Sequence, residues 1–305
     1  MRETQFSGRD FVAVAAIVLI WGTNFVVMKV ALRSFTPFEL GAARFLLAAI
    51  PLIFIVPAPR LPWKWIVLYG LFQGVGQMGL LFVSLRVGMT AALASVLLQT
   101  QMFFTAVFSS LALAEMPRKA QVLGMAIAAL GLSCFAMNYI VADAATQGGT
   151  TVLGFALCLG AASMWGVSNI VVRLAQRDAP GFDALGFLVL SCAVPVLPFV
   201  ALTLLLNEPA AQSQRTASSS WQSWLAVVYL SWIATILAYT MWTNLIKRHG
   251  ANKVAPFSLG VPVVGIASGV LLLGEQITTW QCAGIMLTVL ALAYAVLGGA
   301  RSRPA

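Results

Sequence analysis

The amino-acid sequence predicts an all-α membrane protein with ten transmembrane helices, arranged as two inverted five-helix repeats with both termini in the cytoplasm. Three observations carry this prediction. The 305-residue chain is 60% hydrophobic and only 9% charged, whereas soluble proteins carry about 25% charged residues. Its apolar residues fall into ten runs, each close to the roughly 20 residues that a spanning helix needs. Finally, the first half of the sequence matches the second half at fixed offsets.

Short polar or proline-containing segments separate the ten predicted spans. Helix-stopping sequences include PAPRLP at 57–62, EMPRK at 115–119 and KRHGANK at 247–253. The first apolar run is longer than the core of a cleaved signal peptide and lacks a cleavage site, so we expect a retained helix. The predicted spans cover residues 11–32, 37–56, 63–85, 90–114, 120–140, 152–174, 184–205, 221–246, 251–273 and 278–297.

The basic residues predict the orientation, because Lys and Arg accumulate in cytoplasmic segments of membrane proteins. With the N-terminus inside, thirteen of the 18 basic residues fall in cytoplasmic segments and four in external ones, while Arg44 lies within a span. Both termini are therefore expected in the cytoplasm. The same topology accounts for the net charge of +9, so the charge does not indicate a nucleic-acid partner.

An internal repeat relates the two halves of the chain. Matches at an offset of 144 begin in the first span, and matches at an offset of 160 follow the longer linker before span eight. Each repeat has five spans, which is an odd number, so the two halves must enter the membrane from opposite sides. This arrangement is typical of alternating-access transporters. We assign residues 1–140 to the first repeat, 141–151 to a linker and 152–305 to the second repeat with a short basic tail. The matches include Trp21 with Trp165, Lys29 with Arg173, Tyr69 with Tyr229 and Glu115 with Glu275.

Polar and aromatic residues within the spans predict a substrate cavity, because polar groups at membrane depth usually face the bundle interior or a wet cavity. Trp21, Asn24 and Met28 share one face of the first span. Gln99 and Gln101 lie about 200° apart around an ideal helix, so we expect only one of them to face the cavity. An amide-rich, aromatic cavity would suit a small zwitterion. The candidates are Trp21, Asn24, Arg44, Gln77, Gln99, Gln101, Trp165, Asn169, Tyr239, Trp242, Ser258 and Pro262.

Each candidate also has a structural interpretation. Amide and hydroxyl side chains often only join neighbouring helices, at about 0.6 kcal/mol per bond, and Trp can anchor a helix at the interface. Arg44 could pair within the bundle, for example with Glu39, or bind a substrate carboxylate. The basic residues near the ends of spans one and six are interpreted as snorkelling side chains that set the topology. They are Lys29, Arg33, Arg173 and Arg177.

The acidic residues are informative because none of the nine lies in the middle of a predicted span. A proton-coupled antiporter normally carries a titratable residue there, so we expect facilitated movement down the substrate gradient. The four cysteines and the single histidine form no cluster with metal-ligand spacing, and neither a metal nor another cofactor is expected. Two different protein classes are also weighed: a polytopic membrane enzyme, which would need a nucleophile or an acid/base pair, and a channel or scaffold.

Four segments carry a resemblance to a known family. They are WGTNFVVMKVAL (21–32), AARF (42–45), ALASVLLQTQMFFT (92–105) and KVAPFSLGVPVVGIASGVLLLGE (253–275). With the ten-helix duplication, they resemble the EamA family of the drug/metabolite transporter superfamily, and within it the exporters of O-acetylserine and cysteine metabolites.

That resemblance covers nearly the whole chain and implies an inner-membrane exporter of small amino acids and related metabolites, with a central cavity between the halves. Different cargo within the superfamily, namely aromatic amino acids, nucleosides or drugs, is the nearest alternative. The expected partners are a small zwitterionic substrate and the lipid bilayer. A monomer is favoured.

Overall fold

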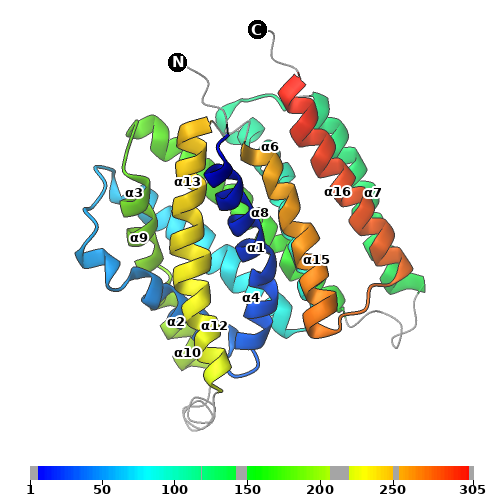
Figure 1. Cartoon of the computed structure of the whole chain (residues 1–305), viewed down its shortest axis with the longest axis horizontal. Coiled ribbons are helices and arrows are strands. Elements are labelled where there is room, and N and C mark those ends of the chain that lie inside the picture. The colour runs from blue at the N-terminus through cyan, green and yellow to red at the C-terminus, as the bar shows by residue number, and fades with distance from the viewer. Residues whose placement is uncertain (1–5, 118, 142–149, 207–219, 250–253, 302–305) are drawn as a thin grey trace.

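The computed structural model contains one bundle of helices, without strands in the described part of the chain (Figure 1). The start of α1 and the end of α16 lie at the same end of this bundle (Figure 1). We call this end the termini side and the opposite end the far side. The structure describes residues 6–117, 119–141, 150–206, 220–249 and 254–301.

The first repeat contributes five spans, three of which contain short segments that are not α-helical. Span two ends in a 3₁₀ turn, span three contains a π-helical stretch, and span four contains a 3₁₀ turn. The elements are α1 (Gly8–Ala31), α2 (Pro37–Ala49), η1 (Leu52–Phe54), α3 (Trp63–Tyr69), η2 (Gly70–Met78), α4 (Gly79–Arg86), α5 (Ala91–Leu97), η3 (Leu98–Thr100), α6 (Gln101–Leu113) and α7 (Lys119–Val141).

The second repeat contributes the other five spans. Within the described residues, nine helices of the chain are long and apolar enough to cross a membrane, and a shorter apolar helix covers Phe257–Leu273. The predicted all-α fold with ten spans is therefore confirmed. The elements are α8 (Val152–Asp178), α9 (Ala184–Ala193), α10 (Val196–Leu206), α12 (Trp221–Val228), η5 (Tyr229–Leu237), α13 (Ala238–His249), η6 (Ala255–Leu259), α15 (Gly260–Leu273) and α16 (Thr279–Arg301).

The first helices of the two repeats run in opposite directions. α1 ends on the far side, where Arg86 at the end of α4 donates to the Leu32 carbonyl over 2.9 Å. α8 begins on the same side, where the Thr151 hydroxyl donates to the Val87 carbonyl over 2.7 Å. An inverted repeat requires this arrangement. The linker assigned to residues 141–151 lies mostly outside the described residues, so the repeat boundary stays a prediction.

The interruptions of the spans fall at equivalent places in the two repeats. Spans two and seven break at Pro51 and Pro195, which are related by the offset of 144, and proline cannot continue α-helical hydrogen bonding. The π-helices η2 and η5 coincide within one residue at the offset of 160, and the 3₁₀ turns η3 and η6 overlap. Met102 stands in span four where span nine has Pro262, so the break in span four does not depend on a proline.

The described carboxylates lie at helix ends. Asp10 and Glu39 complete capping boxes at the starts of α1 and α2, and Asp183 caps α9. Such caps satisfy backbone N–H groups that the first turn of a helix leaves without partners. The remaining three are Glu115, Asp178 and Glu275, at the ends of α6, α8 and α15. Glu3, Asp143 and Glu208 lie outside the described residues.

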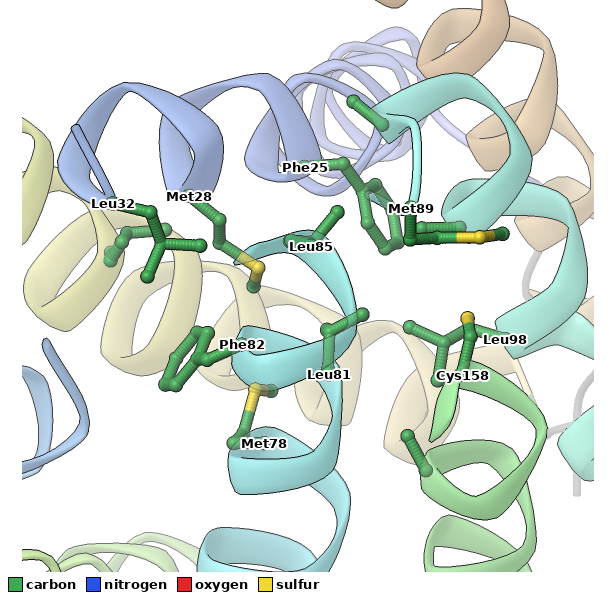
Figure 2. Close-up of a cluster of buried hydrophobic side chains, with 14 of the residues drawn as sticks. Phe25, Met28, Leu32, Met78, Leu81, Phe82, Leu85, Met89, Leu98 and Cys158 are labelled. Carbon is green, nitrogen blue, oxygen red and sulfur yellow. The ribbon is translucent and has the colours of Figure 1, made fainter. Parts of the chain in front are cut away.

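The largest cluster of buried apolar side chains joins the two repeats. Figure 2 shows Leu85 of α4 between Phe25 and Met28 of α1, and Leu81 one turn away on the side of Leu98 and Cys158. Large apolar side chains such as those of Leu111, Leu197 and Leu271 are instead exposed on the outside of the bundle. A lipid-facing surface requires such apolar residues, because hydrocarbon offers polar groups no partners.

Candidate substrate cavity

A cavity of about 360 Å³ lies between the two repeats. Its wall contains eleven of the twelve residues that were predicted to surround a substrate. The exception is Pro262, which is buried in the first turn of α15 and does not line the cavity. The eleven are Trp21, Asn24, Arg44, Gln77, Gln99, Gln101, Trp165, Asn169, Tyr239, Trp242 and Ser258.

Both Gln99 and Gln101 line this cavity, so the prediction that only one of them could face it is wrong. The prediction assumed an ideal α-helix, whereas Gln99 lies in the 3₁₀ turn η3 and Gln101 begins α6. On an ideal α-helix the two side chains would be about 160° apart by the shorter way around the axis. A 3₁₀ turn advances about 120° per residue instead of about 100°, so this angle falls to about 120°. Each amide contacts the second repeat: Gln99 donates to the Ser258 carbonyl over 3.3 Å, and Gln101 accepts from Asn169 over 2.7 Å.

Three aromatic side chains form one side of the cavity. The Trp21 ring centroid lies 5.2 Å from that of Tyr239 and 5.4 Å from that of Trp242. The Trp21 indole also donates to the Ala234 carbonyl, within the π-helix η5, over 3.1 Å. Trp21 therefore holds the two repeats together and lines the space between them.

Arg44 is the one charged side chain among the described residues of the cavity wall. It is 2% exposed, and its Nη2 donates to Thr235 Oγ1 over 3.0 Å. The Thr235 hydroxyl can accept this bond because its own proton goes to the Leu230 carbonyl. Glu39, which the sequence offered as a partner, instead accepts from the backbone N–H of Thr36 over 2.7 Å.

A chain of hydrogen bonds fixes the amides of the π-helix η2. Ser168 of α8 donates to Gln73 Oε1 over 2.6 Å, and Gln73 Nε2 donates to Gln77 Oε1 over 3.1 Å. All three side chains are buried. Buried polar groups of this kind are costly unless they are paired, so the network orients Gln77 at the edge of the cavity.

Sequence reasoning missed several members of the wall, including Tyr69 and Met102. Tyr69 could have been found, because its match with Tyr229 in the second repeat marked the position. Met102 carried no signal, since one methionine in an apolar span resembles any packing residue.

A pocket of about 540 Å³ on the termini side adjoins the cavity, and Gln101, Met102 and Asn169 line both. Glu115 lies at its rim. This carboxylate lies 2.6 Å from Arg173 and 3.5 Å from Arg177, and it accepts from the Ser109 hydroxyl over 2.6 Å. The hydrogen bond from Ser109 and the charges of both arginines hold the pKa of Glu115 below its ordinary value.

The far side carries the repeat-related ion pair. Lys29 Nζ lies 3.2 Å from Glu275 Oε1, and the Glu275 carboxylate also accepts from the backbone N–H groups of Ala91 and Ala92 over 2.7 and 2.9 Å. Glu275 therefore caps α5. Lys29, Arg173 and Arg177, which the sequence analysis interpreted as snorkelling side chains, each pair with a carboxylate from the other repeat. Their role in setting the topology stays a prediction. Arg33 lines a separate pocket on the far side.

Comparison with known proteins agrees with this architecture. The profile of the EamA-like transporter family matches residues 10–137 and 152–297. A protein of Salmonella typhimurium named "Probable amino-acid metabolite efflux pump" is 36% identical over 96% of each chain, and one of Escherichia coli with the same name is 34% identical over 96% of each. "Uncharacterized inner membrane transporter YedA" of Escherichia coli is 24% identical over 94% of this chain and 90% of its own.

A crystal structure described only as that of a protein aligns with 98% of this chain and 100% of its own. The TM-score is 0.62 at 20% identity, which supports the fold alone. The family match spans both repeats, and the apolar helices span the inner membrane several times. This chain belongs to the EamA-like transporter family.

Proposed function

We propose that this protein exports small amino acids and related metabolites across the inner membrane through the central cavity. The observation that carries the proposal is the cavity wall, which combines amides, aromatic rings and one buried guanidinium between the repeats. A small zwitterion needs both donors and acceptors, and such a wall supplies them. Two relatives that match over nearly their whole length are named probable amino-acid metabolite efflux pumps, which supports the same substrate class.

Transport would occur by alternating access. The cavity adjoins a wide pocket at the termini side, whereas α5 and α15 pack closely at the far side. An inverted repeat allows a second state in which the two ends exchange these arrangements. If the termini are cytoplasmic, as the basic residues predict, the present state would load substrate from the cytoplasm.

Movement would be facilitated rather than coupled to protons. The described carboxylates lie at helix ends, and none of them lines the cavity. Proton-coupled carriers use a titratable group at membrane depth, and the described wall offers only amides, rings, hydroxyls and a guanidinium for the substrate. The gradient of the substrate itself would then provide the driving force.

Aromatic amino acids are the second candidate cargo. The ring cluster of Trp21, Tyr239 and Trp242, with Trp165 also in the wall, favours them. Ring faces attract other rings as well as cations. Nucleosides and drugs are less favoured cargo, because no single contact in the described wall points to either of them.

The test is counterflow in proteoliposomes that contain the purified protein. The panel should include cysteine, O-acetylserine, serine, phenylalanine, a nucleoside and a cationic dye. The proposal predicts saturable exchange of the small amino acids that does not respond to an imposed pH gradient alone. Leu271→Ala, on the exposed outer face, is a control that should transport normally. Transport of the dye without any amino acid would contradict the proposal.

A further inference from the structure

We infer that Arg44 and Asn24 recognise the two charges of one substrate: the Arg44 guanidinium binds the carboxylate, and the Asn24 side-chain oxygen accepts from the ammonium group. The ligand class is therefore amino acids with both groups free. The inference rests on the proposed function, because it places the transported molecule in the central cavity.

Two nitrogen atoms of the Arg44 guanidinium are free to donate to a ligand. Its Nε and Nη1 have no hydrogen-bond partner among the described residues, and Arg44 belongs to none of the ion pairs formed there. It donates to the Thr235 hydroxyl, and the rings of Phe45 and Phe82 are each centred 6.0 Å from the guanidinium carbon. Cys192 and Tyr239 line the same small space, and neither is a carboxylate. A buried charge without a counter-ion is costly. The planar fork of a guanidinium matches a carboxylate, which would supply the missing charge and bonds.

Asn24 offers the complementary atom. The side chain is 8% exposed, and its Oδ1 is buried without a partner among the described residues. A carbonyl oxygen is an acceptor, so it suits an ammonium group and cannot bond a carboxylate. Trp21 lies one turn before Asn24 on the same face of α1, and its ring contacts Trp242. Such ring faces attract cations and would add to the binding of the ammonium group.

The second repeat does not duplicate these two groups. At the offset of 144, Leu188 stands at the position of Arg44, and Ser168 at the position of Asn24. Leu188 carries no charge, and the Ser168 hydroxyl already donates to Gln73. The cavity is thus asymmetric in charge although its helices are related by symmetry. A zwitterion would be held in one orientation, with its carboxylate toward α2 and its ammonium group toward α1.

A structural role for Arg44 makes a different prediction. A space of about 30 Å³ next to Arg44 is lined by Gln73 and Ser191 among others, and Ser191 Oγ also lacks a partner among the described residues. That volume suits about one water molecule, which could satisfy Arg44 and Ser191 together. In that case Arg44 would stabilise the fold without binding the substrate.

The experiment compares an accepted amino acid with its amide, which lacks the carboxylate, and with its N-acetyl derivative, which lacks the ammonium group. Each compound competes with labelled amino acid for transport by wild type, Arg44→Gln, Arg44→Lys and Asn24→Leu. Arg33→Gln makes the same chemical change outside the cavity and is the matched control. Wild type and Arg33→Gln should prefer the free amino acid over both derivatives by about 10- to 100-fold, as expected for charge-assisted bonds.

Arg44→Gln should lose most of the preference over the amide but keep the preference over the N-acetyl derivative. Asn24→Leu should show the reverse, and Arg44→Lys should retain part of the first preference. A folded Arg44→Gln protein with unchanged selectivity would overturn the inference and assign Arg44 a structural role. If Arg44→Gln does not fold, the wild-type and Asn24→Leu ratios decide: equal affinity of wild type for acid and amide contradicts the carboxylate site.

These outcomes separate the inference from the proposed function. If wild type transports amino acids but accepts their amides equally well, only the assignment of Arg44 fails. If wild type transports no amino acid at all, the proposed function itself fails.

Discussion

Glu275 and Glu115 occupy equivalent places at opposite ends of the molecule, yet their surroundings differ. Glu275 is 7% exposed in its side chain, pairs with Lys29 and caps α5. Glu115 is 39% exposed in its side chain, pairs with Arg173 and Arg177, and borders an open pocket. The carboxylate of the ion pair between the repeats is thus buried at one end and exposed at the other. The residues equivalent to Ala91 and Ala92 are 251 and 252, which lie outside the described residues.

The neighbouring residues explain how one end closes more tightly. On the far side, Gly269 lies against Ala92, and Gly265 lies so close to Ser95 that a Cβ atom would overlap it. At the offset of 160, the first repeat has Thr105 and Ser109 in place of these glycines, and both line the pocket of the termini side. Small residues allow helix backbones to approach closely in membranes. The symmetry therefore holds for the topology, while these residues let α15 approach α5 closely on the far side and leave a pocket open on the termini side.

The largest effect is expected from Glu275→Gln. The change removes the charge that pairs with Lys29 and weakens the cap of α5, which should cost on the order of 3 kcal/mol. The measurement is thermal unfolding of the purified protein in detergent. Glu115→Gln is the matched control and should lower the midpoint much less, because its site is solvated. Equal decreases in the two variants would show that the ends are not different in this way.

Gly265→Ala should separate α5 from α15. The added methyl group overlaps Ser95, and overpacking of this kind typically costs about 1–3 kcal/mol. We expect faster labelling of a cysteine introduced at Ser95 by a membrane-impermeant thiol reagent. Gly8→Ala, where nothing lies within 4 Å of the new atom, should leave labelling unchanged. If Ser95→Cys labels no faster with Gly265→Ala than without it, the far side is not closed by this contact.

Exchanging the acid and the base of an ion pair should restore transport at the termini side but not at the far side. At the termini side, Arg173→Glu with Glu115→Arg should restore much of the transport that either single change removes, because the Ser109 hydroxyl can also accept a bond. At the far side, Lys29→Glu with Glu275→Lys should fail, since an ammonium group cannot accept from the N–H groups of Ala91 and Ala92. Initial rates of counterflow measure both pairs. Equal rescue at the two ends would argue against the capping role of Glu275.

The smallest effect concerns pH. The Ser109 hydrogen bond and the two arginines lower the pKa of Glu115 from 4.5, so its ion pairs persist at higher pH and are lost only as pH falls through the lowered value. With equal pH on both sides, the ratio of the wild-type rate to the Glu115→Gln rate should stay constant between about pH 5.5 and 8. A step in that ratio would mean that Glu115 titrates in this range.

The pattern of apolar residues was sufficient to predict the spans, because an apolar run of about 20 residues between helix stops is typical of a membrane-spanning helix. Sequence reasoning also identified eleven residues of the cavity wall. Trp21 and Asn24 share a helix face by spacing alone, and the repeat then pointed to Trp165 in the opposite half. Their assignment to substrate binding stays a proposal.

What sequence reasoning could not predict were contacts between distant residues. Lys29 and Glu275 are 246 positions apart, and each is ordinary at the end of a span. The matches of Lys29 with Arg173 and of Glu115 with Glu275 contained the signal, but only the fold shows that each base pairs with the acid of the other repeat. The prediction for Gln99 and Gln101 failed for another reason, because a 3₁₀ turn stands where an α-helix was assumed.

The central claim is that the two ends of the cavity open in alternation, and cysteine labelling tests it most directly. One reporter is Ser95→Cys on the far side and the other is Thr105→Cys in the termini-side pocket, each in a transport-active background without Cys134, Cys158, Cys192 and Cys282. Introducing Glu275→Gln should accelerate labelling of the first reporter and slow labelling of the second by an impermeant thiol reagent. Labelling that changes in the same direction at both ends, or at neither, would contradict alternating access in this protein.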